Sequence, residues 1–184
     1  MSDNMDDLIR QYEEMHRAGH FTGRALSDLE DVLGEIIHQT ESRTIIDYGS
    51  GKGEAYTGDG LLRKWGIEVT CYDPAVPGFK TRPLGKFDGV ICNDVMEHIP
   101  EPHVPEVLRD VLSYATKFAF FQICTRKAKK NLPDGRNCHL TVRPSEWWMA
   151  RIGEAQAAVG GPETIRVVWH LEGRERVMEN ALAG

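Results

Sequence analysis

Three side chains that could bind a metal ion or move a proton stand close together in the stretch DVMEHIPEPH, residues 94–103. Asp94, Glu97 and His98 are spaced i, i+3 and i+4, so on a helix they would project from one face. Two carboxylates and an imidazole on one face predict a divalent-metal site, an acid–base cluster, or only a polar helix start. The elements around the stretch decide which of these is favoured.

Short apolar runs rich in β-branched and aromatic residues surround this stretch. They are RTIIDYG, IEVTCYD, FDGVICND and KFAFFQIC, and the first three carry an aspartate at their ends. Between the third and fourth runs, apolar residues from Val104 to Leu112 repeat at helical spacing, and a helical piece is expected over 55–65. This alternation predicts an α/β fold with a mostly parallel sheet covered by helices on both faces.

The flanks of the chain add helices and one hairpin. Met5, Leu8, Ile9, Tyr12 and Met15 form one apolar stripe, and a capping box at Ser27–Glu30 starts a second helix that ends near Thr40. A helix is predicted from Pro144 to Gly160, followed by an antiparallel hairpin around Glu172–Gly173. We expect a single domain over 1–184, with 1–40 as an N-terminal helical lid on a core of 41–184.

Composition excludes several classes of protein. The 184 residues carry a net charge of −6, which does not favour wholesale binding to a nucleic-acid backbone. No apolar run approaches the roughly 20 residues that cross a bilayer, and the acidic N-terminus lacks the basic and apolar regions expected of a secretion signal. The four cysteines form no CxxC pair, so neither a zinc ribbon nor a disulfide framework is predicted. A cytoplasmic protein is the simplest interpretation.

A glycine loop follows the first predicted strand in the sequence DYGSGKGEAY. Gly49, Gly51 and Gly53 would let the backbone turn sharply and approach a ligand closely. The loop is not a P-loop, because no glycine stands five residues before its Gly-Lys pair and no Ser or Thr follows that pair. Asp73 ends the next strand, where a carboxylate suits hydrogen bonding to ribose hydroxyls.

The order DxGxGxG, acid-ending strand and FDGVICND resembles class I S-adenosylmethionine-dependent methyltransferases over roughly residues 44–124. The resemblance implies a Rossmann-like three-layer fold and a methyl donor with its amino-acid end over Gly49–Gly53 and its ribose on Asp73. The donor-binding residues that it implies are Tyr12, Asp47, Gly49, Gly51, Gly53, Asp73, Pro74, Asn93 and Asp94. Only PAVPGFKTRPLGK separates the second and third runs, so the sheet should be abbreviated near the family's third strand.

The acidic stretch has its own resemblance within that family. Asp94, Glu97 and His98 match the acid-xx-Glu-His pattern of 2′-O-methyltransferases of small-RNA 3′ ends and of ubiquinone-pathway O-methyltransferases. His139, in NCHLTVRPSEWW, would be the fourth ligand of Mg²⁺, Mn²⁺ or Zn²⁺. The ion would bind a substrate hydroxyl and lower its pKa.

Two other interpretations of the acidic stretch stay open. In a metal-free site, His98 or His139 would be the general base and Asp94 or Glu97 would orient it. In a structural turn, Glu97 would accept hydrogen bonds from loop amides and His98 would pack beneath the donor. His16 and His20 are further candidates in the lid.

The segment TRKAKKNLPDGRN carries five basic residues and one acid after the fourth run. A solvated charge run is the ordinary interpretation, and a rim for an anionic substrate is the functional one. Trp147 and Trp148 could stack on a sugar or base, or belong to the core. We expect O-methylation of a glycan or hydroxylated metabolite.

Three alternatives remain open for the function. The first is methylation of an RNA 3′-terminal ribose. The second is a non-catalytic donor-binding subunit. The third is an NAD-dependent oxidoreductase, against which stand the GxGxG spacing and the lack of an obvious Tyr-xxx-Lys pair.

Overall fold

The structure is a computed structural model that describes residues 4–21, 26, 29–57, 64–160, 166–172 and 177–179, the last two segments as backbone only. In chain order the helices are α1 (Met5–Arg17), α2 (Glu30–Gln39), α4 (Val104–Ser113) and α5 (Ser145–Val159). The strands are β1 (Thr44–Tyr48), β2 (Glu68–Tyr72), β3 (Phe87–Asn93), β4 (Ala115–Cys124), β5 (Arg166–Glu172) and β6 (Val177–Glu179). Three short 3₁₀ helices are η2 (Glu54–Tyr56), η3 (Met96–His98) and η4 (Glu101–His103).

One sheet orders these strands as β2-β1-β3-β4-β5-β6. The first five pair in parallel, and β6 pairs with β5 in the antiparallel sense. The predicted α/β sandwich and the antiparallel C-terminal pair are therefore confirmed. The chain runs from β1 out to the edge strand β2 and then returns past β1 to β3, so the strand order reverses between β1 and β3.

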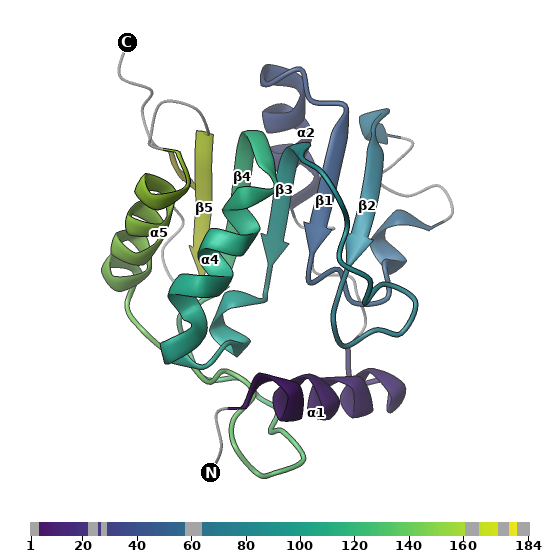
Figure 1. Cartoon of the computed structure of the whole chain (residues 1–184), viewed down its shortest axis with the longest axis vertical. Helices are drawn as coiled ribbons and strands as arrows, with labels where there is room; N and C mark the ends of the chain where they lie inside the picture. The colour runs from purple at the N-terminus through teal and green to yellow at the C-terminus, as the bar shows by residue number, and fades with distance from the viewer. Residues whose placement is uncertain are drawn as a thin grey trace.

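Helices cover both faces of the sheet, as Figure 1 shows, with α4 and α5 on one face and α2 on the other. The strand β4 explains why both layers are required, because its side chains alternate between the faces with the period of two that strands have. Phe118 and Phe120 pack with the α2 cluster, whereas Phe121 and Ile123 pack with α4 and α5. All four side chains are fully buried.

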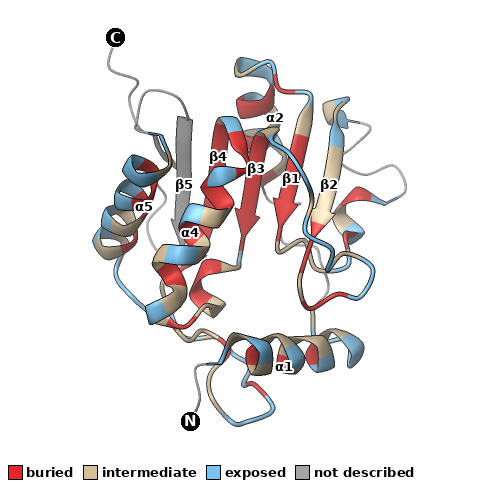
Figure 2. Cartoon of the chain, viewed as in Figure 1, coloured by how far each residue is buried: buried red, intermediate tan, exposed pale blue. Residues whose placement is uncertain are grey.

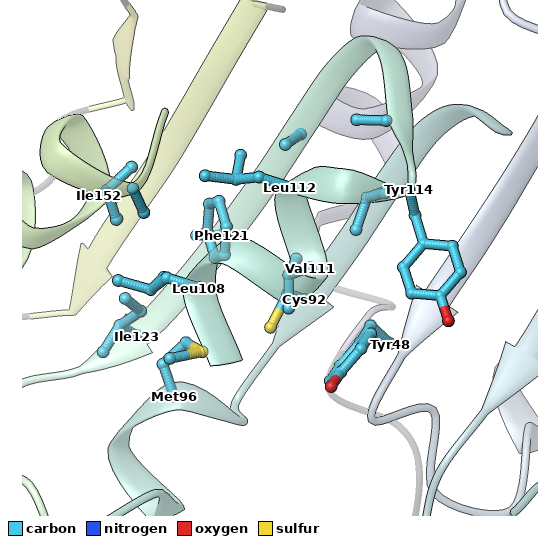
Figure 3. Packing of buried hydrophobic residues seen from close by; sticks show 14 of the residues in the cluster. Tyr48, Cys92, Met96, Leu108, Val111, Leu112, Tyr114, Phe121, Ile123 and Ile152 are labelled. Carbon is cyan, nitrogen blue, oxygen red and sulfur yellow. The ribbon is translucent and has the colours of Figure 1, made fainter. Parts of the chain in front are cut away.

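The larger core cluster lies between the sheet and α4 and α5. Figure 3 shows Leu108, Val111 and Leu112 of α4 packed over Cys92 and Phe121 of the central strands. Burial is concentrated on these strands and on the inward faces of the helices, as Figure 2 shows. The apolar spacing in the sequence of α4 therefore predicts its buried face correctly.

The helix α1 lies apart from these layers, across the carboxyl ends of the strands (Figure 1). Its predicted apolar stripe is confirmed, with Leu8 and Met15 buried, and the side chain of Asn4 caps its first turn by accepting from the amide of Asp6 at 2.9 Å. The sequence assigned both N-terminal helices to a lid, which is wrong for the second. Leu33 and Ile36 of α2 pack against the sheet, so α1 alone covers the strand ends.

Further predictions concern individual segments of the chain. The segment 73–86 between β2 and β3 contains no helix or strand, so the predicted abbreviation of the sheet is confirmed. Of the helix predicted over 55–65, the structure has η2 and a helical end at residues 64–65, and residues 58–63 lie outside the described part. The capping serine Ser27 also lies outside it. No helix in the described part of the chain is long and apolar enough to cross a bilayer.

Candidate active site

A cavity of about 680 Å³ opens at the carboxyl ends of the central strands. Its wall includes Gly49 after β1, Asp73 after β2 and Asn93 at the end of β3. The helix α1, which crosses these strand ends, contributes Tyr12 and His16. In open α/β sheets, ligands bind outside the carboxyl ends of the strands, where the strand order reverses. The reversal between β1 and β3 places this cavity where such a ligand is expected.

The turn after β1 requires glycine for steric reasons. Gly49 has a φ of 83°, and a Cβ built on it would lie 2.2 Å from Cγ2 of Val95. The turn is fastened to β2 by Asp73, whose two carboxylate oxygens accept from the amides of Gly51 at 2.9 Å and Ala75 at 2.8 Å. The glycine loop and the acid that were predicted to bind one ligand are therefore in direct contact.

Two polar groups lie behind this turn with unusual surroundings. The Asp47 carboxylate accepts a hydrogen bond from the Tyr56 hydroxyl at 2.9 Å. Burial raises the pKa of Asp47 to about 7, against the opposing effect of that hydrogen bond, and the charge of Asp73 raises it further. Oδ1 of Asn93 is buried without a hydrogen-bond partner. A ligand with a cationic group or a hydrogen-bond donor would stabilise the ionised Asp47 carboxylate and supply a partner for Oδ1 of Asn93.

A second group of side chains converges on the same cavity. Glu97, His98 and His139 each offer a ligand-type atom, and these atoms lie within 4.8 Å of one another. Oε1 of Glu97 accepts from the Cys124 amide at 2.8 Å, while Oε2 is buried with no hydrogen-bond partner. Burial, and secondly the nearby Asp94 carboxylate, raise the pKa of Glu97. A buried carboxylate with a free oxygen needs either a proton or a cation.

Hydrogen bonds to backbone carbonyls fix the tautomers of both histidines. Nδ1 of His98 lies 3.0 Å from the Cys138 carbonyl oxygen, and Nδ1 of His139 lies 2.5 Å from that of Arg126. Because a carbonyl can only accept, each Nδ1 carries a proton, which leaves Nε2 as the ring nitrogen available to a ligand. Burial and the neighbouring His139 lower the pKa of His98 to about 3, so this imidazole is neutral. Metal-binding histidines have this arrangement.

The distant His139 reaches this site through backbone contacts of its own segment. The amide of Thr141 donates to the carbonyl oxygen of Glu97 at 3.0 Å, and its hydroxyl donates to that of Ile99 at 2.7 Å. Oδ1 of Asn137 accepts from the amide of His139 at 3.1 Å. Segment 137–141 is therefore fastened to the turn that carries Glu97 and His98.

Comparison with known protein families decides the identity of this fold and cavity. A family model described as a methyltransferase domain matches residues 17–157, which is most of the chain. The chain belongs to this methyltransferase family. It is a class I S-adenosylmethionine-dependent methyltransferase, and its cofactor is therefore S-adenosylmethionine. No curated protein matches the chain.

The cavity of this methyltransferase fits the donor on two observations. S-adenosylmethionine carries an α-ammonium group and a sulfonium, both cationic, and the raised pKa of Asp47 marks a carboxyl that lacks a cationic partner. The unpartnered Oδ1 of Asn93 offers an acceptor in the same wall. Of the residues predicted to bind the donor, these line the cavity: Tyr12, Asp47, Gly49, Gly51, Asp73, Pro74, Asn93 and Asp94.

Gly53 does not line the cavity, although the sequence placed it there. A Cβ on Gly53 would lie 3.1 Å from Sγ of Cys71 and 3.4 Å from the ring of Phe79, on the side of β2. The residue serves the turn itself, with a φ of 65° at the start of η2.

Asp94 departs from the sequence prediction in its backbone. The spacing argument assumed one helical face, but Asp94 has a φ of 54° and precedes the 3₁₀ helix η3. Its side chain is exposed and is not among the three residues whose ligand atoms converge. The acid-xx-Glu-His pattern therefore supplies two convergent side chains, and Asp94 raises the pKa of Glu97 through its charge and through a side-chain hydrogen bond.

The helix α1 connects the two halves of the site. His16 lies over the glycine loop, with Nε2 3.9 Å from Oδ2 of Asp73, and burial lowers the pKa of His16. Tyr12, one turn earlier, contacts His98. The sequence offered His16 only as a further candidate, yet its i+4 spacing from Tyr12 already placed both side chains on one helical face. His20 is exposed and outside the cavity wall.

The tryptophan pair belongs to the body of the protein. Trp148 is fully buried in the cluster of α4 and α5. Trp147 packs beside the guanidinium groups of Arg143 and Arg151, 5.9 and 5.8 Å from its ring centroid. Neither ring lines the cavity, so a stacking surface for the substrate is excluded there.

Proposed function

We propose that this methyltransferase transfers the donor's methyl group to a hydroxyl oxygen of a small metabolite or glycan, assisted by a divalent metal ion. The observation that carries the proposal is the convergence of Glu97, His98 and His139 within 4.8 Å in the donor cavity. Methyl transfer from a sulfonium donor needs mainly in-line placement of the accepting oxygen. A metal site beside the donor is suited to placing a hydroxyl.

The donor would be held by the loop after β1 and the acid after β2. We assign Gly49 and Gly51 to its amino-acid end and Asp73 to its ribose, with Asn93 and Asp47 as polar partners in the same wall. Asp73 already holds the amides of Gly51 and Ala75. These hydrogen bonds would hold the loop in one conformation before the donor binds, which reduces the entropy lost on binding.

The ligand chemistry favours zinc over magnesium. Two imidazoles and one carboxylate form a mixed nitrogen–oxygen set, whereas magnesium prefers oxygen ligands. Ligands about 2.1 Å from a tetrahedral ion lie about 3.4 Å apart, so a spacing that does not exceed 4.8 Å needs only side-chain adjustment. Three protein ligands would leave a position for a substrate hydroxyl, as in catalytic zinc sites, and a bound ion would lower the pKa of that hydroxyl.

The test measures metal content and donor binding on the same preparations. We expect one bound ion per wild-type chain, lost in Glu97→Gln and His139→Ala and retained in the control His38→Ala, whose side chain is exposed outside the cavity. Calorimetry should show S-adenosylmethionine binding in all four proteins. If wild type holds no ion and chelator-treated enzyme keeps its turnover of donor to S-adenosylhomocysteine, the metal assistance is wrong.

The accepting atom is tested with matched acceptors. Pairs of sugars that differ only in a hydroxyl or an amine at one carbon are incubated with the enzyme, and product mass is measured. Methylation of the hydroxyl compound supports oxygen transfer. Methylation of the amine alone would overturn it while leaving the methyltransferase activity in place.

A further inference from the structure

The segment after β4 is a loop with internal hydrogen bonds that borders the cavity. We call its residues 125–140 the basic loop. Its two arms are joined by a β-bridge between Asn131 and Asn137. The amide of Leu132 donates to the Arg136 carbonyl oxygen at 2.7 Å, and the Ala128 amide donates to Oδ1 of Asn137 at 2.9 Å. The side chains of this loop are therefore presented from an ordered backbone.

Most of the positive charge of the basic loop faces the cavity. Arg126, Lys127, Lys129 and Lys130 all belong to its wall. The loop's own acid does not neutralise them, because Asp134 pairs with Arg136 at 2.7 Å and accepts from the side-chain Nε2 of Gln11 at 3.0 Å. The sequence could not separate a solvated charge run from a substrate rim, and this placement favours the rim.

Lys127 and Lys129 are the two cations of this loop that are available to a ligand, and Lys52 of the glycine loop is a further cation in the same wall. Lys130 donates to the His20 carbonyl oxygen and lies 5.0 Å from the ring centroid of Phe21, so it fastens the loop to the chain beyond α1. Lys127 and Lys129 are exposed and form no ion pair within the described residues. Two ammonium groups two residues apart on one cavity wall present a charge that suits a dianion.

The position of the basic loop connects it to the proposed metal site. The Arg126 carbonyl oxygen accepts from Nδ1 of His139, so the first arm of the loop is joined to one of the three convergent side chains. Lys127 follows directly in the chain. The lysines, His98 and His139 line the same cavity, so one acceptor could place a hydroxyl at the convergent side chains and an anionic group at the lysines.

Resting on the proposed function, we propose that the acceptor is a small phosphorylated hydroxyl compound whose phosphate binds Lys127 and Lys129. Lysine is a common phosphate partner, and a phosphate dianion engages two ammonium groups. A small acceptor is favoured over a polymer because a nucleic-acid track needs many cations, whereas the chain is acidic overall and these cations belong to one loop. A cavity of about 680 Å³ is of the size that small-molecule sites have.

The experiment uses ribose 5-phosphate as the probe and ribose as its uncharged counterpart. Binding is measured by calorimetry on wild type, on Lys127→Ala/Lys129→Ala, and on Lys80→Ala/Lys86→Ala. The last variant removes the same charge from exposed positions outside the cavity wall. We expect ribose 5-phosphate to bind wild type and the control alike, with an affinity about tenfold or more above ribose, and to lose about tenfold in the loop variant.

Several results would overturn the proposal. These are equal affinities for ribose and ribose 5-phosphate, equal losses in the two double variants, or a parallel loss of S-adenosylmethionine affinity in the loop variant. A short RNA oligonucleotide forms a separate arm, and binding of RNA without binding of ribose 5-phosphate would also overturn it, in favour of a polymer end. Metal content and donor binding are measured on the same samples, so failure of the proposed function is recognised separately.

Discussion

The hydroxyl of Tyr12 lies 2.8 Å from Nδ1 of His98, although 86 positions separate the two residues in the chain. The same hydroxyl lies 2.9 Å from the Cys138 carbonyl oxygen, which also accepts from His98. Tyr12 therefore completes the hydrogen bonding around the ring nitrogen opposite the one that faces a ligand. One helix thus positions a histidine of the site that it covers.

Replacing Tyr12 with phenylalanine should weaken the proposed metal site without removing a ligand. Outer hydrogen bonds of this kind change metal affinity or activity by about 10–100-fold when they are lost. The measurement is a metal titration of chelator-treated protein, alongside donor turnover. Tyr114→Phe is the control, because its hydroxyl bonds to the Pro83 carbonyl oxygen at 3.3 Å and lies outside the cavity wall. Unchanged metal affinity in Tyr12→Phe would contradict the role.

Gly49→Ala should disable the donor loop. The left-handed φ and the 2.2 Å approach of a Cβ to Val95 both oppose a side chain, so we expect a loss of about 1–3 kcal/mol in the free energy of unfolding. Donor affinity should fall as the loop shifts. Adding Val95→Ala should recover only part of the stability, because it removes the clash and leaves the strained φ. Gly78→Ala, with open space around it, is the control.

Asp47 predicts a specific pH dependence. Its folded pKa of about 7 lies above the ordinary value of 3.8, so the proton is bound more tightly in the folded state. The corresponding stability is present at low pH and is lost as pH rises from about 4 through 7. Denaturant unfolding should show this loss in wild type, and Asp47→Asn should lack it.

Donor binding should show the opposite trend with pH. The cationic groups of S-adenosylmethionine favour the ionised carboxylate, so binding to Asp47 should tighten as pH rises through about 7. Calorimetry across this range measures the effect. If Asp47→Asn retains the same pH dependence as wild type, another group is responsible.

Trp148→Ala should destabilise the protein far more than Trp147→Ala. Trp148 is fully buried between the sheet, α4 and α5, and truncating such a side chain costs about 3–5 kcal/mol. Trp147 is half-buried beside two arginines, so its loss should cost about 1 kcal/mol. Chemical denaturation measures both. A larger loss in Trp147→Ala would show that the core is assigned wrongly.

Sequence patterns predicted most of the fold because they reflect local physics. The residue types of β1 and of the glycines after it predict a strand followed by a tight turn without reference to the rest of the chain. The apolar stripe on α1 follows from helical spacing alone. The sequence predicted less well which part of the protein each helix packs against. Both N-terminal helices have an apolar face, but only contacts with Ile45 and Phe120 assign α2 to the sheet.

The sequence by itself identified the methyltransferase family and the candidate groups of the site. The glycine loop, Asp73 and the Glu97–His98 pair were named from residue types and spacing, which depend on short stretches of chain. Tertiary structure alone decided which of these groups meet. It brought His139 to the pair, gave Asp94 a left-handed backbone in place of a helical one, and placed His16 and Tyr12 over the cavity. These outcomes depend on packing between distant segments, which no local pattern encodes.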